Sequence, residues 1–328
     1  MSERIFSGIQ PSGNLHLGNY LGAIKNWVKL QEAYDSIFCI VDLHAITVPQ
    51  NPQELSRKTL EVAKFYLASG IDPKKSIIFI QSQVHEHTEL MWLLNTIANT
   101  SDLNKMTQFK DKSSKENNLA SISAGLLNYP ILMAADILLY DTNLVPVGED
   151  QLQHVELTRK LGRKFNQQFS ETFVLPEGFT QKETQRIMGL DNPTNKMSKS
   201  ASSEYNRIGM LDDAGTITKK IMKAITDSDQ GLEYSDEKPA LKNLLNIFGA
   251  VTDQKPEEIV IKFQNKGYKE FKEALAEAII NYLKPIQEKY HQISDDEIKS
   301  ILANGAARAQ EIAKVKIQEV KEKMGLII

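Results

Sequence analysis

The sequence contains a single cysteine, Cys39, among its 328 residues. One cysteine forms no internal disulfide, and no cysteine cluster exists to hold zinc or an iron–sulfur cluster. Cys39 lies in the apolar run 37–41, where we expect it to pack as a small buried side chain. The composition therefore gives no reason to expect a zinc or iron–sulfur cofactor.

Long hydrophobic runs and an excess of basic charge are absent as well. No segment approaches the ~18 consecutive apolar residues of a membrane span, and the first residues lack the apolar stretch of a signal peptide. We therefore expect a cytoplasmic protein with no membrane partner. With 39 basic and 42 acidic residues the net charge is −3, so we expect no DNA partner. RNA binding stays compatible with this charge, because counterion release depends on local contacts.

The first half of the chain alternates short apolar runs with amphipathic stretches. Residues 5–8, 37–41 and 77–80 are typical of strands, the last two buried on both faces. Residues 52–68 have the apolar spacing of a helix, and another helix should begin near Asn19. This alternation predicts a doubly wound parallel sheet of the Rossmann type, whose ligands bind at the carboxyl ends of the strands.

The pattern changes after about residue 200, where strand signals give way to helical ones with Lys and Glu faces. We expect a Rossmann-type domain over 1–207, including an inserted segment at about 101–140, and an all-helical domain over 208–328. Pro285 is expected to kink or end a helix in the second domain.

A short loop rich in lysine and serine follows a cluster of turn-forming residues at 191–195. The loop consists of Lys196, Met197, Ser198, Lys199 and Ser200. Ammonium and hydroxyl groups on such a loop can surround a polyphosphate and follow it as its charge moves. Taken alone, the pentapeptide is equally well explained as a solvated loop.

A second phosphate-binding pattern lies near the N-terminus, where a strand should pass into a helix. Gly18 lets the backbone approach a ligand closely, and the helix N-terminus offers unpaired N–H groups. The neighbouring His16 side chain can donate to a phosphate oxygen. Taken alone, this stretch is more readily explained as a glycine-containing turn with an incidental histidine. The preceding residues 10–13, Gln-Pro-Ser-Gly, strengthen the functional interpretation.

These two patterns, in this order, resemble the two signatures of class I aminoacyl-tRNA synthetases. The stretches 6–13 and 18–23 are similar to the N-terminal signature of bacterial tryptophanyl-tRNA synthetases. Further similar stretches follow in the same order at 40–47, 106–110, 133–138, 145–151 and 196–200. The class I pattern has a second histidine where this chain has Asn19, a departure that favours the tryptophanyl over the tyrosyl branch.

The resemblance implies an enzyme that activates L-tryptophan with ATP, forming tryptophanyl-adenylate and pyrophosphate. Tryptophan would then pass to the 3′ end of tRNA(Trp), and the helical domain would read the anticodon. Magnesium would be carried with ATP, no metal site belongs to the protein itself, and the protein would be a homodimer.

The resemblance also assigns roles to individual residues. Catalytic handling of the phosphates is implied for His16, Asn19, Lys196, Ser198 and Lys199. ATP contacts are implied for Gln10, Pro11, Ser12, Gly18, Asn19, Lys112, Gly148, Glu149, Asp150, Ile187, Lys196, Met197, Ser198, Lys199 and Ser200. Tryptophan contacts are implied for Phe6, His44, Tyr129, Met133, Asp136, Val147 and Gln151.

Asp136 carries a physical argument of its own. It lies in the apolar stretch 126–139, where an acid is costly unless it is paired or hydrogen-bonded. An indole N–H would satisfy the carboxylate, whereas phenylalanine would leave it unpaired. From the residues alone, a neighbouring N–H or arginine is the more ordinary partner; the resemblance reverses this preference.

Other polar clusters have simpler explanations. His85, Glu86 and His87 are more typical of a helix start than of a metal site, because no third and fourth ligands are evident. The lysines at 219, 220, 223 and 314–323 are candidates for RNA contacts, although most are typical of solvated helix faces. Lys112 is equally well explained as a solvated loop lysine.

Three other functions stay open from the sequence. A tyrosyl synthetase would share the fold and both phosphate signatures. A small-molecule nucleotidyltransferase also uses a His-x-Gly motif, but should lack the long helical region. A non-catalytic RNA-binding relative is expected to have lost catalytic residues, and this chain keeps Gly18, Asp136, Lys196 and Lys199.

Overall fold

The computed structural model describes residues 3–108, 123–180, 187–199, 201, 203–227 and 231–327. Two residues expected in the ATP site, Lys112 and Ser200, lie outside these ranges. Within the described residues, no helix is both long and apolar enough to cross a membrane.

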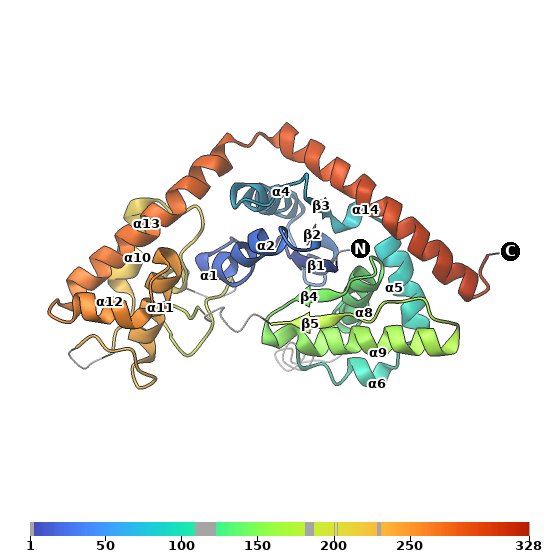
Figure 1. Ribbon diagram of the computed structural model, residues 1–328, viewed down its shortest axis with the longest axis horizontal. Helices are drawn as coiled ribbons and strands as arrows, with labels where there is room; N and C mark the ends of the chain where they lie inside the picture. The colour runs from blue at the N-terminus through green and yellow to red at the C-terminus, as the bar shows by residue number, and fades with distance from the viewer. Residues whose placement is uncertain are drawn as a thin grey trace.

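Five parallel strands form a single sheet (Figure 1). They are β1 (Arg4–Ile9), β2 (Asp35–Ile40), β3 (Ser76–Ile80), β4 (Leu144–Pro146) and β5 (Glu177–Phe179). Their order in the sheet is β3-β2-β1-β4-β5. The order reverses between β1 and β4, and a crevice is expected at the carboxyl ends of these two strands. The doubly wound sheet predicted from the sequence is confirmed.

Helices cover both faces of the sheet. The main ones are α2 (Lys25–Leu30), α4 (Pro52–Ala68), α5 (Glu86–Ile97), α8 (Ala124–Leu138) and α9 (Leu152–Gln168). Alternate strand residues enter two separate cores: Phe38 and Ile40 face one, whereas Ile37 and Cys39 face the other. This alternation follows from the two-residue period of a strand. It also confirms that Cys39 is a buried, apolar-packed side chain.

The first helical segment is continuous but irregular. It begins as α1 (Leu17–Asn19), passes through a π-helical turn, η1 (Tyr20–Ile24), and continues as α2. A π-turn widens the helix locally and exposes backbone that a regular α-helix would cover. Small elements near the site are α3 (Asp42–Ala45), η2 (Gln81–Gln83), α6 (Thr100–Leu103), η4 (Glu149–Gln151) and η5 (Glu204–Asn206).

The helices that follow the sheet form the second half of the chain's regular structure. They are α10 (Ala214–Lys223), α11 (Pro239–Thr252), α12 (Pro256–Phe263), α13 (Tyr268–Gln292) and α14 (Asp295–Lys323). The helix α13 does not end at Pro285 but continues through it. Leu283 and Ile286 on either side are buried, so packing stabilises the helix across the lost hydrogen bond.

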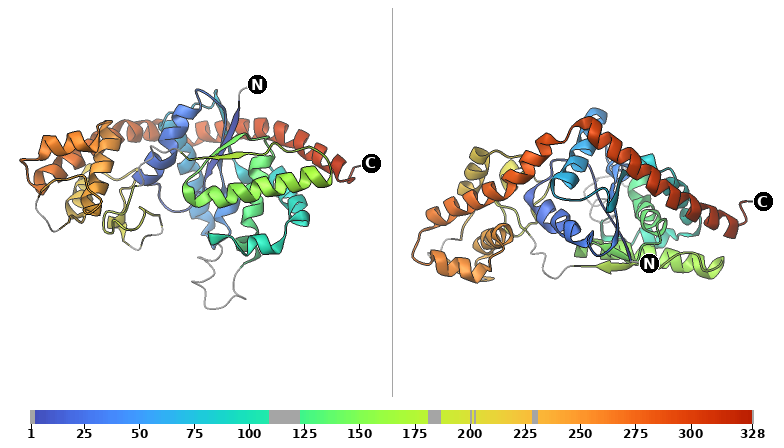
Figure 2. Two further views of the ribbon diagram at one scale, coloured as in Figure 1. Left: turned by 60° about the horizontal axis from the view of Figure 1, so that its bottom comes forward. Right: turned by 45° about the horizontal axis from the view of Figure 1, so that its top comes forward.

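The two longest helices have different neighbours. The helix α13 packs on α10 and α11, whereas α14 returns to the sheet and packs on β3 and α5 (Figures 1 and 2). A Cβ atom at Gly305 of α14 would overlap the backbone carbonyl of Ile78 in β3, so glycine is required for this approach. The boundary expected near 207 stays a prediction, and the helical residues are divided between two packing partners.

Candidate active site

A cavity of about 330 Å³ lies at the point where the strand order reverses. Its walls include the carboxyl ends of β1 and β4 and the inner face of α8. All seven residues expected to contact tryptophan line it: Phe6, His44, Tyr129, Met133, Asp136, Val147 and Gln151. The residues are far apart in sequence, and the parallel sheet brings them to one edge.

Asp136 lies on α8 with only 1% of its surface exposed. Three side chains donate to its carboxylate. Nε2 of His44 lies 2.7 Å from Oδ2, and Nε2 of Gln81 lies 2.7 Å from Oδ1. Nδ1 of His87 lies 2.6 Å from Oδ1. Burial alone would raise the pKa of Asp136, but the favourable interactions with His44 and His87 outweigh it and hold the pKa below its usual range. The acid is therefore ionised at neutral pH.

Two of these partners, Gln81 and His87, were not expected from the sequence. The expectation that 85–87 begins a helix is confirmed, because α5 starts at Glu86, but His87 also turns inward. Its Nε2 lies 2.8 Å from the hydroxyl of Tyr140. Gln81 directly follows β3. Its position at the carboxyl end of a parallel strand, where ligands gather, is the signal by which it could have been found.

Tyr129 closes another side of the cavity. Its hydroxyl donates to Oε1 of Gln108 at 3.1 Å and lies 3.0 Å from Nε2 of His154. Burial raises the pKa of Tyr129 to about 12, so the phenol stays neutral. The ring meets the His44 ring edge-on, with centroids 6.2 Å apart. Tyr129 is thus held in a fixed orientation toward the cavity.

His16 caps the N-terminus of α1. The backbone N–H of Asn19 donates to Nδ1 of His16, and the His16 N–H donates to Oδ1 of Asn19, both at 3.3 Å. Burial, together with the positive charges of Lys199, Arg207 and Lys196, lowers the pKa of His16 to about 3. The ring is therefore neutral, and because Nδ1 accepts, the proton is on Nε2. This leaves Nε2–H as a donor for an anion.

The lysine-rich loop is held by neighbouring loop segments, one of which is bound to the helical region. The backbone of Met188, which precedes the loop, exchanges two hydrogen bonds with the side chain of Asn243 in α11, at 2.8 and 3.0 Å. Oδ1 of the buried Asn206 accepts from the N–H of Ser198 at 3.2 Å. Met197 is buried and Lys196 is exposed. Asn206 and Asn243 were not expected from the sequence, which gave no signal for them.

Lys199 brings this loop to the N-terminal signature. Its Nζ donates to the carbonyl of Gln10 at 3.1 Å. Its side chain packs on Gly13, whose φ of +62° places it in the left-handed region. Burial and the nearby charge of Lys58 lower the pKa of Lys199 to about 8, although Glu61 acts in the opposite direction. The sequence showed only the order of the two signatures along the chain; in the structure they lie in contact.

The other residues expected at the ATP site have different environments. Gly148, Glu149 and Asp150 are exposed at the start of η4, and Oδ2 of Asp150 accepts from Gln151 at 2.8 Å. Ile187 is buried, and its carbonyl accepts from the N–H of Met197 at 3.1 Å. Pro11 is buried, Ser12 is half-buried, and Gly18 and Asn19 are half-buried on the first helix.

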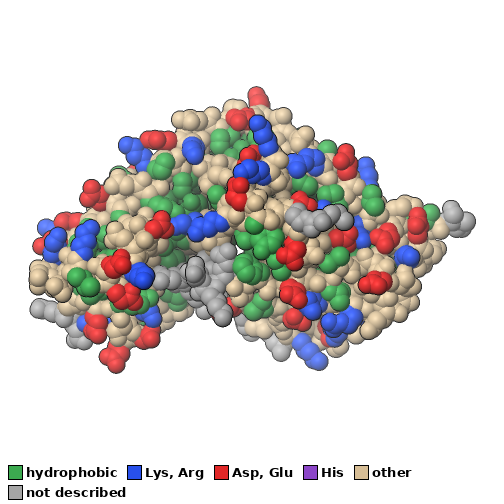
Figure 3. Space-filling model, in the orientation of Figure 1, with side chains coloured by type: hydrophobic (Ala, Val, Ile, Leu, Met, Phe, Trp, Pro, Cys, Tyr) green, Lys and Arg blue, Asp and Glu red, His purple; other side chains and the backbone are tan. Residues whose placement is uncertain are grey.

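Two of the lysines considered for RNA contacts form ion pairs within the protein. Lys220 pairs with Asp212 at 2.6 Å, and the buried Lys316 pairs with Asp141 at 2.9 Å. Lys223 lies over the half-buried ring of Tyr205, with its Nζ 4.5 Å from the ring centroid. Basic and acidic side chains are interspersed on the face shown in Figure 3. No group of three His, Cys, Asp or Glu side chains suited to a metal ion occurs among the described residues.

Comparisons with known proteins agree with this geometry. Residues 2–284 match the family described as tRNA synthetases class I (W and Y), and the chain belongs to this family. Among its relatives named tryptophan–tRNA ligase, the proteins of Caldanaerobacter subterraneus subsp. tengcongensis and Helicobacter pylori are each 52% identical. The alignments cover 99% of this chain and 99% of each relative.

Solved structures give the same result. The tryptophanyl-tRNA synthetase of Mycoplasma pneumoniae superposes with a TM-score of 0.91 at 37% identity, covering 100% of this chain and 99% of the other. The enzyme of Campylobacter jejuni, in a complex with ADP and tryptophan, superposes with a TM-score of 0.85 at 38% identity. That match covers 98% of this chain and 100% of the other.

Proposed function

We propose that this protein activates L-tryptophan with ATP and transfers it to tRNA(Trp). One observation carries the proposal: an ionised, buried carboxylate stands in the wall of a largely apolar cavity, and both phosphate signatures lie close to that cavity. The cavity suits a large aromatic side chain with one N–H donor, and the signatures suit a nucleoside triphosphate.

The Asp136 carboxylate has room for one more donor. A carboxylate offers about four lone-pair directions, and His44, Gln81 and His87 occupy three. The indole N–H of tryptophan would take the fourth, while Phe6, Met133 and Val147 pack on its ring. Tyr129 and Gln151 would hold the α-amino group. Phenylalanine has no donor and would bury the charge without its last hydrogen bond.

The chemistry requires stabilisation of phosphate charge rather than a covalent intermediate. The tryptophan carboxylate attacks the α-phosphate in line, and pyrophosphate leaves with the magnesium that ATP carries. Neutral His16 donates from Nε2, and Asn19 supports the same backbone turn. The negative charge of the departing pyrophosphate is stabilised by Lys196, Ser198 and Lys199. Contacts from Gln10, Pro11, Ser12, Gly18, Lys112, Gly148, Glu149, Asp150, Ile187, Met197 and Ser200 would hold ATP.

The second half of the reaction uses the helical region. The 3′ end of the tRNA takes the tryptophanyl group, and residues 208–328 would read the anticodon. The fold over 1–207 would hold both small substrates. We further propose that the protein acts as a homodimer in the cytoplasm, as the resemblance implies. Support comes from the full-length similarity to relatives named tryptophan–tRNA ligase.

The test is pyrophosphate–ATP exchange with each of the twenty amino acids, without tRNA. We expect exchange with tryptophan alone, followed by charging of a tRNA(Trp) transcript. Exchange with tyrosine would overturn the assignment of Asp136 and move the protein to the tyrosyl branch. Absence of exchange with every amino acid would overturn the proposed reaction and favour an RNA-binding or other nucleotidyl-transferring relative. Sedimentation of the pure protein tests the dimer.

A further inference from the structure

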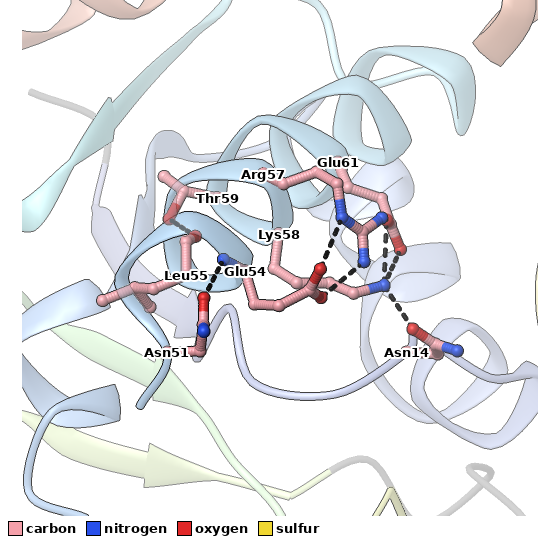
Figure 4. A network of polar contacts seen from close by, with 8 residues as sticks. All are labelled: Asn14, Asn51, Glu54, Leu55, Arg57, Lys58, Thr59 and Glu61. Atoms are coloured by element: carbon pink, nitrogen blue, oxygen red, sulfur yellow. Dashed lines mark hydrogen bonds and ion pairs between the residues drawn. The ribbon is translucent and has the colours of Figure 1, made fainter. Parts of the chain in front are cut away.

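A buried lysine stands behind the phosphate site, on a helix to which the sequence gives no catalytic role. Lys58 belongs to α4, and its side chain is 9% exposed. Its Nζ lies 2.9 Å from both carboxylate oxygens of Glu61, one turn further along the same helix and equally buried. The outer side of Glu61 is also paired with Arg57 at 3.0 Å. Figure 4 shows these groups converging.

The ammonium of Lys58 has one further contact, and that contact leaves the helix. Its Nζ donates to Oδ1 of Asn14, which belongs to the turn between β1 and the first helix (Figure 4). Asn14 is itself exposed. A buried ammonium has three N–H donors to satisfy, and Asn14 provides an acceptor in addition to the two carboxylate oxygens of Glu61. The contact therefore fixes the turn to α4.

This turn is the surface on which Lys199 rests. Gly13, next to Asn14, packs against the Lys199 stem, and the Gln10 carbonyl accepts from Lys199 Nζ at 3.1 Å. The turn then leads directly into His16, the cap of the first helix. Displacing Asn14 would thus disturb the seat of Lys199 and the position of the His16 ring together.

We propose that Lys58 is a positioning residue for the phosphate site. Lys58 holds the 10–14 turn in place through Asn14 and, together with Glu61, determines the electrostatic environment of the Lys199 ammonium. The proposal deepens the proposed function and rests on it, because Lys199 is taken to bind the leaving pyrophosphate. Lys58 itself touches no substrate. Its role is to fix the position of the Lys199 ammonium relative to the His16 ring.

Charge gives this role a signature that simple packing lacks. Lys199 is influenced by Lys58 and Glu61 of α4, and its own charge acts on His16. Arg57 pairs with Glu61 and remains in place when Lys58 is altered, and the Glu61 carboxylate also acts on the Tyr290 phenol of α13. Removing the positive charge of Lys58 should raise the pKa of Lys199. Removing the negative charge of Glu61 should lower it.

The experiment compares Lys58→Met, Glu61→Gln and Asn14→Ala with a matched control, Lys64→Met. Lys64 is a cation on the same helix whose ammonium pairs with Asp295 of α14 at 2.6 Å instead of with the turn. In pyrophosphate exchange, we expect Lys58→Met and Asn14→Ala to raise the KM for ATP about tenfold, the range for loss of a charged hydrogen bond. The KM for tryptophan should stay within about twofold. The control should change neither value.

The pH profile of kcat/KM for ATP provides the second readout. Its alkaline limb should move to higher pH in Lys58→Met and to lower pH in Glu61→Gln. The double variant Lys58→Met with Asn14→Ala should be no worse than the poorer single variant, because both changes remove one interaction. Asn14→Ala alters an exposed side chain, so the test holds even if Lys58→Met melts at a lower temperature.

The outcomes separate this inference from the proposed function. The role of Lys58 alone would be overturned if the alkaline limb moved in the same direction in Lys58→Met and Glu61→Gln. It would also be overturned if Lys58→Met and Asn14→Ala both kept the ATP KM of the unaltered protein. Failure of the unaltered protein to exchange with any amino acid would overturn the proposed function, and the inference with it.

Discussion

The two halves of the site are built in different ways. Around Asp136, every group that contacts the carboxylate is buried and comes from the sheet side of the molecule. At Lys199, the ammonium comes from a loop whose neighbouring segment at Met188 is bound to α11, and it donates to the carbonyl of Gln10 in the N-terminal turn. The side-chain pocket is thus pre-formed, whereas the phosphate site is assembled from two parts of the fold.

The difference teaches where each kind of selectivity resides. A rigid, dry pocket discriminates by what it leaves unpaired, and this requires little movement. A site that must follow a leaving pyrophosphate gains from a loop that can change its contacts during the reaction. Changes on one side should therefore leave the other nearly intact, and the following predictions test that separation.

The largest effect is expected for Lys199→Ala. Loss of a cation that stabilises the departing pyrophosphate should lower the rate of adenylate formation by about 100- to 1000-fold. The dissociation constant for tryptophan should change by less than about twofold, because the Asp136 pocket is untouched. Single-turnover kinetics and calorimetry measure the two quantities. A large loss of tryptophan affinity would mean that the loop is not confined to the phosphates.

Asp136→Asn should produce the next largest effect, on the opposite side. Its amide NH₂ would face donors from His44, Gln81 or His87 in place of an acceptor. We expect kcat/KM for tryptophan to fall about 100-fold, as for loss of a charged hydrogen bond in a buried site. The KM for ATP should stay near its original value. An unchanged KM and kcat for tryptophan would refute the assignment of the indole partner.

The two halves should also respond differently to pH. Lys199, with its pKa lowered to about 8, is charged below that pH and loses its charge above it. The kcat/KM for ATP should therefore fall by about tenfold per pH unit once the pH passes 8. Tryptophan affinity should be flat between pH 7 and 9, because Asp136 stays ionised and Tyr129 stays neutral. Lys199→Arg should remove the alkaline limb, and its persistence in that variant would assign it to another group.

The smallest effect is expected for Gly13→Ala. The positive φ disfavours a side chain by about 1 kcal/mol, and the new Cβ would press on the Lys199 stem at 3.2 Å. The KM for ATP should rise about fivefold, with tryptophan binding unchanged. Gly125→Ala in α8 is the control, because its Cβ would meet only Ser123 at an ordinary 3.8 Å. Equal effects of the two variants would show that the turn does not seat Lys199.

The sequence predicted the parts of the fold that have a strong local pattern. The helix expected over 52–68 is α4, and the apolar runs at 37–41 and 77–80 correspond to β2 and β3 within a residue or two. Strand β5 was missed because it has three residues, Glu177–Phe179, two of them exposed and one a glycine. Its pairing with β4 stabilises it, not its own composition.

The site residues likewise divide into those that a local sequence motif identifies and those that it does not. Those carried by the two signatures could be predicted from their motifs, and the structure gathers them in space. The partners of Asp136 could be predicted only in part: His44 was expected in the pocket, whereas Gln81 and His87, which lie 55 and 49 residues from Asp136 in sequence, were not. No local sequence pattern links such positions; the folded parallel sheet brings them together. Lys58 was missed for a similar reason, since a lysine three residues before a glutamate is typical of any solvated helix.

The seating of α14 on β3 has a consequence for how the protein is made. Chains fold as they emerge from the ribosome, N-terminal parts first, yet the strand β3 receives its cover only after α10 to α13 have been synthesised. Until then the part of the second core that Ala309, Ala313 and Val320 complete lacks these three side chains. A nascent chain carries this incompletely covered sheet edge through much of its synthesis. The nascent chain should therefore need chaperone protection until α14 has been synthesised and has packed on β3.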